Sequence, residues 1–89
     1  MSTSTPDQPL SVVIPAYNEE KTVAQVIDAV LSVSLVGEVI VVDDCSADRT
    51  SRIVQAIADS NPKVRLLRHE VNQGKGAALR TGFEGATLP

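Results

Sequence analysis

The chain has 89 residues, of which 43% are hydrophobic and 21% charged, and its formal net charge is −3 at pH 7. This balance excludes the low hydrophobicity and high charge of an intrinsically disordered chain. With one Tyr, one Phe and no basic excess, the chain has little to offset phosphate charge or to stack on bases, which argues against nucleic acid as a partner.

The first expected unit is a strand followed by a helix. Residues 1–9 are polar and contain proline, and we expect them to form a disordered leader. Residues 10–15 (LSVVIP) are a short apolar run ended by proline, which is typical of a buried strand. Asn18 is a favoured N-cap residue, so a helix is expected to begin there. Apolar residues at helical spacing over 23–31 give this helix one buried stripe.

The second unit repeats this order. Residues 38–42 (EVIVV) are a continuous β-branched run, as expected of a parallel strand buried on both faces. Ser46 is the expected cap of the next helix, whose apolar stripe lies within 53–58. Asn61 and Pro62 end that helix.

The third unit begins with a strand at about 63–68 (KVRLLR). A glycine-rich loop then leads into a helix that is expected to bury Leu79, Phe83 and Ala86 on one side. The single His69 follows the strand, and we expect it to be a solvated strand-end residue.

Three consecutive βα units specify an α/β fold with a doubly wound parallel sheet, because right-handed crossovers leave few alternatives. We expect the strand order 3-2-1, with the first two helices on one face and the third on the other. Ligands of such sheets bind at the carboxyl ends of the strands. The candidate site therefore lies among residues 15–19, 43–46 and 69–76.

Known phosphate-binding motifs do not fit the glycine-rich loop. Leu79 stands where G-x-G-x-x-G needs its last glycine, and no Gly-Lys-Ser/Thr triplet is present. Lys75, between two glycines, either offers a mobile ammonium to a diphosphate or belongs to a flexible loop, and the residues alone favour neither.

Acidic residues follow the first two strands. Glu19 and Glu20 are placed either to accept hydrogen bonds from a nucleoside or to stabilise the helix dipole. Asp43 and Asp44 end the second strand, where adjacent side chains face opposite ways. At most one of this pair is expected to point into a given pocket, while the other caps the loop or the next helix.

Three segments resemble family 2 glycosyltransferases: SVVIPAYNEE at 11–20, VIVVDDCSADRT at 39–50 and NQGKGAALRTG at 72–82. The resemblance covers about residues 10–86, and the third segment is most similar to the polyprenyl-phosphate sugar synthase branch, of the dolichyl-phosphate mannose type. It implies that residues 10–89 are the N-terminal, Rossmann-like half of a GT-A domain. The implied reaction transfers a sugar from a UDP- or GDP-sugar, with a polyprenyl phosphate as acceptor.

The resemblance also implies a nucleotide-sugar site at the strand ends, in which Asp44 reads the base. The binding residues that it indicates are Pro15, Ala16, Tyr17, Glu19, Asp43, Asp44 and Lys75. Cys45 stands where the family more often has Gly or Asn, and we expect no redox role for it.

The family's D-x-D or D-x-N metal motif and its acidic general base do not occur in the 89 residues. We therefore expect no catalytic and no metal-binding residue here, and the chain alone is expected to be inactive. Mg²⁺ or Mn²⁺ is implied only for the full-length enzyme. The acidic residues at the strand ends would repel a diphosphate unless such a cation offset them.

Two other functions remain open from the sequence. One is a stand-alone, non-catalytic nucleotide-binding or interaction module, and the other is a fragment of a nucleotidyltransferase. No apolar run approaches the ~20 residues of a membrane span, so we expect a cytoplasmic chain that would meet a membrane lipid acceptor only as part of a full-length protein. An exposed edge of the first strand is expected to favour self-association.

Overall fold

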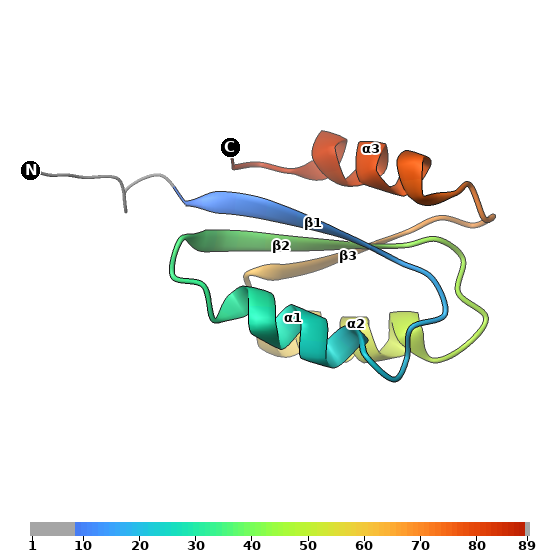
Figure 1. Cartoon of the computed structure of the whole chain (residues 1–89), viewed down its shortest axis with the longest axis horizontal. Coiled ribbons are helices and arrows are strands. Elements are labelled where there is room, and N and C mark those ends of the chain that lie inside the picture. The colour runs from blue at the N-terminus through green and yellow to red at the C-terminus, as the bar shows by residue number, and fades with distance from the viewer. Residues whose placement is uncertain (1–8, 89) are drawn as a thin grey trace, which may run out of the picture.

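The computed structural model describes residues 9–88, so the expected leader lies outside the described residues except for Pro9. Strands and helices alternate along the chain (Figure 1). In order they are β1 (Leu10–Ala16), α1 (Val23–Leu31), β2 (Val36–Asp43), α2 (Thr50–Ser60), β3 (Val64–Arg68) and α3 (Lys75–Gly85).

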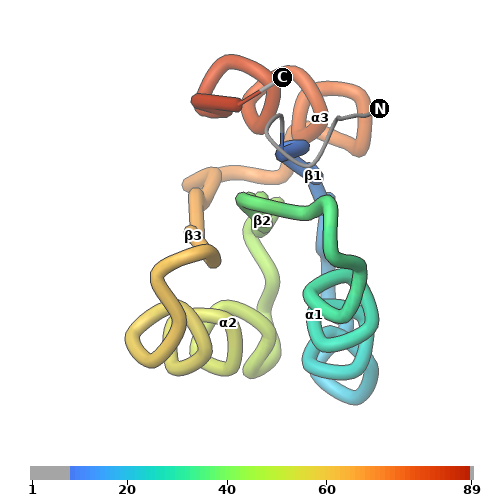
Figure 2. The backbone as a smooth tube through the Cα atoms, turned by 90° about the vertical axis from the view of Figure 1, so that its left-hand side faces the viewer, coloured from blue at the N-terminus to red at the C-terminus, as the bar shows by residue number. Residues whose placement is uncertain are grey.

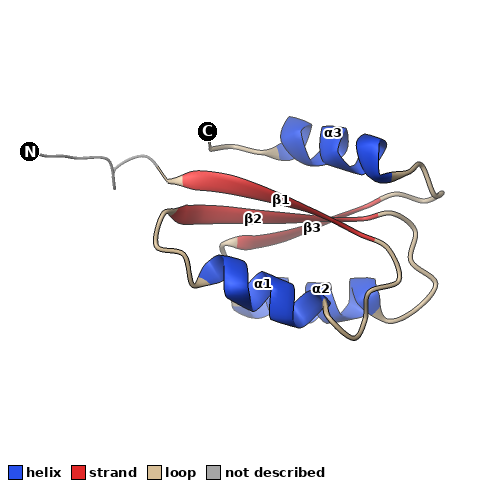
Figure 3. Cartoon of the chain, viewed as in Figure 1, coloured by secondary structure: helices blue, strands red, loops and turns tan. Residues whose placement is uncertain are grey.

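The three strands form one parallel sheet in the order β1-β2-β3, which is the predicted 3-2-1 order. Helices α1 and α2 lie on one face of the sheet and α3 lies on the other (Figure 3). The view along the strands in Figure 2 shows the same two layers on either side of the sheet. The predicted α/β class with three βα units is confirmed.

The central strand β2 supplies most of the core. Every residue from Glu38 to Asp43 is buried. Val39 and Val41 pack with α1 and α2, whereas Ile40 and Val42 pack with α3, because side chains alternate across a strand. The run of β-branched residues therefore fills both faces of the sheet, as its sequence predicts.

Helix α1 begins at Val23 rather than at Asn18, so Glu19 and Glu20 do not lie in its first turn. Asn18 has a φ of 52° in the left-handed region, whereas an N-cap residue needs an extended backbone. The apolar stripe is otherwise as expected, since Val23 and Ile27 are buried.

Helix α2 begins at Thr50, and Ser46 does not cap it. Instead, the backbone N–H of Thr50 donates to the carboxylate of Asp48, with 2.9 Å between nitrogen and oxygen. Ser46 is buried and bound to Asp43, which takes its hydroxyl away from the helix.

Helix α3 buries small residues, Ala78 and Gly82, and the prediction that it buries Phe83 is wrong. Phe83 is 65% exposed. The cause is a close approach to β1, because a Cβ atom built at Gly82 would lie 2.2 Å from Cγ1 of Val13. Only a glycine-sized residue fits at that contact, so the larger side chains of α3 turn away from the sheet.

A buried carboxylate joins β1, β2 and the segment after α3 at the amino ends of the strands. Glu38 accepts hydrogen bonds from the Ser11 hydroxyl at 2.6 Å, from the Thr87 N–H at 3.0 Å and from the Arg65 guanidinium at 3.0 Å. The Ser11 bond, followed by the Thr87 N–H, lowers the pKa of Glu38 from 4.5 to about 2. Within residues 9–88, no helix is long and apolar enough to cross a membrane.

Candidate functional site

A cavity of about 240 Å³ lies at the carboxyl ends of β1 and β2. The connections that follow all three strands contribute to it, together with the start of α3. Its lining residues are Pro15, Ala16, Tyr17, Glu19, Asp44, Asn72, Gly74, Lys75 and Ala78. The structure thus brings together six of the seven predicted binding residues and leaves out Asp43.

Three lining residues were not predicted, namely Asn72, Gly74 and Ala78. All three belong to the segment at 72–82. The motif therefore indicated the segment that lines the cavity, but not which of its residues do so. The Asn72 side chain donates to the backbone carbonyl of Asp44 at 3.3 Å. Gly74 has a φ of 93°, which favours glycine, while a Cβ atom there would meet nothing within 4 Å.

A larger hollow of about 610 Å³ lies over α2 and β3, but it contains none of the seven predicted residues. It is an open hollow between α2 and the edge strand β3. The smaller cavity is the better candidate because ligands of parallel sheets bind at the carboxyl ends of the strands.

Asp44 is the central acidic residue of the cavity, and it is only 4% exposed. Its Oδ1 atom lies 2.7 Å from Nδ1 of His69 and accepts the Gln73 N–H at 2.8 Å, while Oδ2 accepts the Gly74 N–H at 2.8 Å. The His69 bond is the largest cause of a lowered pKa for Asp44, and the two loop N–H groups add to it against the effect of burial. The carboxylate is therefore held in its ionised form.

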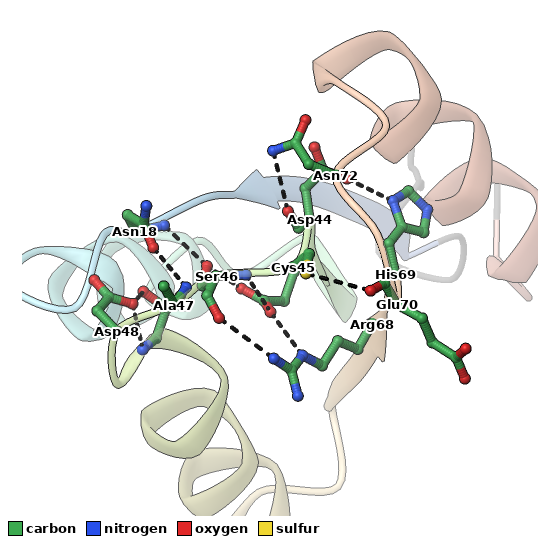
Figure 4. A network of polar contacts seen from close by, with 12 residues as sticks. Asn18, Asp44, Cys45, Ser46, Ala47, Asp48, Arg68, His69, Glu70 and Asn72 are labelled. Atoms are coloured by element: carbon green, nitrogen blue, oxygen red, sulfur yellow. Dashed lines mark hydrogen bonds and ion pairs between the residues drawn. The ribbon is translucent and has the colours of Figure 1, made fainter.

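His69 is buried, at 8% exposure, so the expectation of a solvated residue is wrong. The parallel register pairs Asp43 with Arg68, which places the next residue of each strand, Asp44 and His69, side by side. Figure 4 shows the His69 ring beside the end of β2. The available signal was a polar residue directly after the third strand, level with the acidic pair.

Asp43 is fully buried on the other face of the sheet. Its carboxylate accepts hydrogen bonds from the Ser46 hydroxyl and N–H and from Nε of Arg68, the last at 3.1 Å. As predicted, only one member of the acidic pair points into the cavity, while the other caps a loop.

The β1–α1 connection is fastened to the β2–α2 connection. The Asn18 N–H donates to the Ser46 hydroxyl at 2.9 Å, and Oδ1 of Asn18 accepts the Ala47 N–H at 2.8 Å (Figure 4). The Glu19 N–H donates to the Thr50 hydroxyl at 2.8 Å. Asp43 thus supports the cavity wall indirectly, because it binds the same Ser46 hydroxyl that receives Asn18.

Cys45 has a φ of 65°, a conformation that suits Gly or Asn better than other residues. This conformation gives a physical reason for the Gly or Asn that the resemblance leads us to expect at this position. The Cys45 thiol donates to the Glu70 carbonyl at 3.4 Å, which links the second and third connections (Figure 4).

The open sides of the cavity are formed by Tyr17, Glu19 and Lys75. Tyr17 is 49% exposed, so its ring is available to a ligand. Glu19 folds back to accept the Tyr17 N–H at 3.1 Å. Lys75 is exposed at the first residue of α3, where its charge adds to the positive end of the helix dipole.

The described residues of this chain do not fit the divalent metal that the resemblance implies. Residues 9–88 contain no group of three His, Cys, Asp or Glu side chains that could hold an ion. Asp43 and Asp44 each accept several hydrogen bonds, and their carboxylates lie on opposite faces of the sheet, so they do not converge on one ion. These residues are therefore assigned no role in holding a metal.

Comparison with known proteins supports the same fold and identifies the family. The model of the family described as Glycosyl transferase family 2 matches residues 11–88. The chain is 39% identical over 82 residues to the dolichyl-phosphate beta-glucosyltransferase ALG5A of Trichomonas vaginalis, and 39% identical over 89 residues to the dolichyl-phosphate beta-glucosyltransferase of Homo sapiens. Both relatives belong to the dolichyl-phosphate branch that the segment at 72–82 indicated, but their names give glucose as the sugar, whereas the resemblance pointed to the mannose type.

These alignments cover 82% and 88% of this chain but only 25% and 28% of the two relatives. The chain therefore spans about a quarter of the length of the curated relatives that it matches. Among solved structures, it is similar to the mannosyltransferase PcManGT from Pyrobaculum calidifontis in complex with GDP-Man and Mn²⁺. The TM-score is 0.80 at 29% identity, over 92% of this chain and 26% of that chain.

The structural likeness confirms the expected GT-A arrangement of the three βα units. The family model covers almost all of the described residues and includes all three motif segments. This chain belongs to glycosyl transferase family 2.

Proposed function

We propose that this chain forms the nucleoside-binding half of a sugar-nucleotide site in a glycosyltransferase. The observation that carries the proposal is the convergence of three motif segments on one cavity whose buried carboxylate, Asp44, is held in its ionised form. The cavity volume of about 240 Å³ lies below the ~300–1,000 Å³ of most small-molecule pockets, which suits part of a sugar nucleotide rather than all of it.

Each side of the cavity has a role in this proposal. Asp44 accepts a ring N–H of the base, because an ionised carboxylate can only accept hydrogen bonds. The exposed Tyr17 ring covers the nucleoside, and Lys75 lies where it can approach the diphosphate. The donor is a UDP- or GDP-sugar, and the GDP-Man complex of the structural neighbour supports this class.

The sugar transfer itself is assigned to residues outside this chain. The names of the relatives support a polyprenyl phosphate, such as a dolichyl phosphate, as the acceptor of the whole protein. Membership of the family favours this function over a nucleotidyltransferase fragment. The isolated 89-residue chain is expected to form no product from a sugar nucleotide and a polyprenyl phosphate, whether or not Mg²⁺ or Mn²⁺ is added. Metal-dependent turnover by the pure chain would show that the catalytic residues are here after all.

The test of the nucleoside site is a titration of UDP, GDP and pyrophosphate against the wild type and Asp44→Asn. We expect the better of the two nucleotides to bind roughly 5- to 150-fold more weakly to the variant, the usual effect of losing one hydrogen bond to a partly desolvated group. Pyrophosphate binding should change little. Asp28→Asn is the matched control, because it makes the same change on an exposed part of α1.

Equal losses for nucleotide and pyrophosphate would show that Asp44 acts on charge rather than on the base. Failure of both UDP and GDP to bind to the folded wild type would remove the proposed function. Urea denaturation of each variant separates a binding effect from a loss of folding.

A further inference from the structure

His69 is a buried ring with a polar partner on each nitrogen. Nδ1 lies 2.7 Å from Oδ1 of Asp44, and Nε2 lies 2.7 Å from the hydroxyl oxygen of Thr81. The ring therefore joins the ends of β2 and β3 to the middle of α3. None of the functions assigned above to the cavity uses it.

The hydrogen bonds of Asp44 show what the ring does there. A carboxylate has about four acceptor positions, two on each oxygen. Oδ1 is filled by His69 and the Gln73 N–H, whereas Oδ2 accepts only the Gly74 N–H among the described residues. One acceptor position on Oδ2 is left for a ligand in the cavity that Asp44 lines.

We propose that His69 is a positioning residue that, as the Nδ1–H tautomer, holds Asp44 so that one Oδ2 acceptor position stays open to a ring N–H of the nucleotide base. This inference rests on the proposed function. The inference adds His69 to the residues that serve the site. His69 does not line the cavity, but it sets the orientation of the Asp44 carboxylate.

The chemistry of the three groups fixes the tautomer. Asp44 is ionised, as its lowered pKa indicates, so the proton of the Asp44–His69 bond must belong to Nδ1. In a neutral ring Nε2 is then an acceptor, and the Thr81 hydroxyl donates to it. Among the other donors to the carboxylate, Gln73 and Gly74 act through the backbone of one loop, so His69 is the side chain that sets the orientation.

Two substitutions at His69 separate positioning from mere filling of space. In His69→Asn the amide nitrogen stands at the position of Nδ1, so the bond to Asp44 is kept and the contact with Thr81 is lost. In His69→Gln the amide reaches toward Thr81, and the donor next to Asp44 is lost. Both variants have a polar side chain in place of the ring, which makes each the control for the other.

We expect His69→Asn to bind the preferred nucleotide within about 3-fold of the wild type, and His69→Gln to bind it roughly 5- to 10-fold more weakly, the effect of one net hydrogen bond. Pyrophosphate affinity should be the same in both variants. Equal nucleotide affinities for Asn and Gln would overturn the proposal, as would a greater loss for Asn.

A second measurement needs neither ligand nor variant. Two-bond ¹H–¹⁵N correlations of the ring in the ligand-free intact protein report which nitrogen carries the proton. The Nδ1–H tautomer is expected, and a ring protonated only on Nε2 would overturn the proposal even if the variants failed to fold. If the tautomer is as expected but neither UDP nor GDP binds, the proposed function fails while the arrangement of His69 stands. If nucleotides bind and the tautomer is wrong, only the present inference fails.

Discussion

The carboxylates of Asp43 and Asp44 leave the end of β2 on opposite faces of the sheet. Asp43 shares its face with Val39 and Val41 under α1 and α2, and it binds Ser46 and Arg68. Asp44 lies on the face covered by α3 and lines the cavity. Neighbouring residues of the same chemical type thus have separate tasks.

Asp43→Asn is expected to destabilise the fold more than it weakens ligand binding. The amide cannot accept all the bonds that Ser46 and Arg68 donate, and a lost bond to a buried polar group costs about 1 to 3 kcal/mol. Urea denaturation measures this loss. Nucleotide affinity should fall less than in Asp44→Asn. A greater loss of affinity in Asp43→Asn would mean that the two carboxylates have been assigned the wrong way round.

Arg68→Gln is the companion variant for this pair. The Arg68 side chain is 52% exposed, so water can replace most of its contacts. Its removal should cost no more than about 1 kcal/mol, as is usual for exposed ion pairs. A loss of stability as large as that of Asp43→Asn would mean that the Arg68–Asp43 ion pair, and not the bonds between Asp43 and Ser46, makes the main contribution to the free energy of unfolding.

The sheet could be predicted from the sequence because its signals are local. The β-branched run at 39–42 is typical of a strand buried on both faces, and right-handed helical crossovers to the neighbouring strands then favour the observed order. The same reasoning identified the strand ends where the cavity lies. It also predicted that one residue of the acidic pair points into the cavity while the other caps a loop.

Other features could not be predicted because they depend on contacts between distant segments. His69 is buried only because the register of β2 and β3 places it beside Asp44. Phe83 is exposed only because α3 approaches β1 at Gly82. Asn18 is drawn out of the expected helix by bonds to Ser46 and Ala47, which lie 28 and 29 residues away. Helical spacing and capping preferences do not contain this information.

The contact between α3 and β1 gives a paired prediction at two glycines. Gly82→Ala is expected to lower the free energy of unfolding by about 1 to 3 kcal/mol, because the new methyl group would overlap Val13. Gly76→Ala, in the first turn of the same helix, meets nothing within 4 Å. It should be neutral or stabilising by up to about 1 kcal/mol, because alanine favours helix. Thermal or urea unfolding of the two variants checks this, and similar effects at both positions would contradict the close packing at Gly82.

The isolated 89-residue chain is expected to associate with itself or to unfold broadly. β1 is an edge strand of the described sheet, and most of its residues are apolar. Leu10, at the start of β1, is 44% exposed. Exposed apolar edges pair readily with other chains. Sedimentation velocity over a wide range of concentrations measures the association. A monodisperse monomer with a sharp, reversible melt would contradict this prediction.

A charge on the edge tests where that association occurs. Leu10→Lys should reduce it, because edge lysines oppose strand pairing. Val33→Lys is the control, since Val33 is 52% exposed but lies in the connection between α1 and β2. Equal effects of the two lysines would indicate general solubility rather than pairing at β1.

Glu38 should make the fold sensitive to acid in a defined range. Its pKa is lowered in the folded state from 4.5 to about 2, first by the Ser11 hydroxyl and then by the Thr87 N–H. The folded state therefore favours the ionised form, so this contribution is fully present above about pH 4.5 and is lost as the pH falls toward 2. Glu38→Gln removes the titrating group. The difference in urea midpoint between wild type and Glu38→Gln is expected to be largest near pH 6 and to shrink as the pH approaches 2.

Glu84→Gln is the control for this prediction. Glu84 is exposed on α3, so the variant shows the effect of removing a surface carboxylate from the same molecule. If the wild type and Glu38→Gln differed by the same amount at pH 6 and pH 2.5, the bonds from Ser11 and Thr87 would not be stabilising the ionised carboxylate.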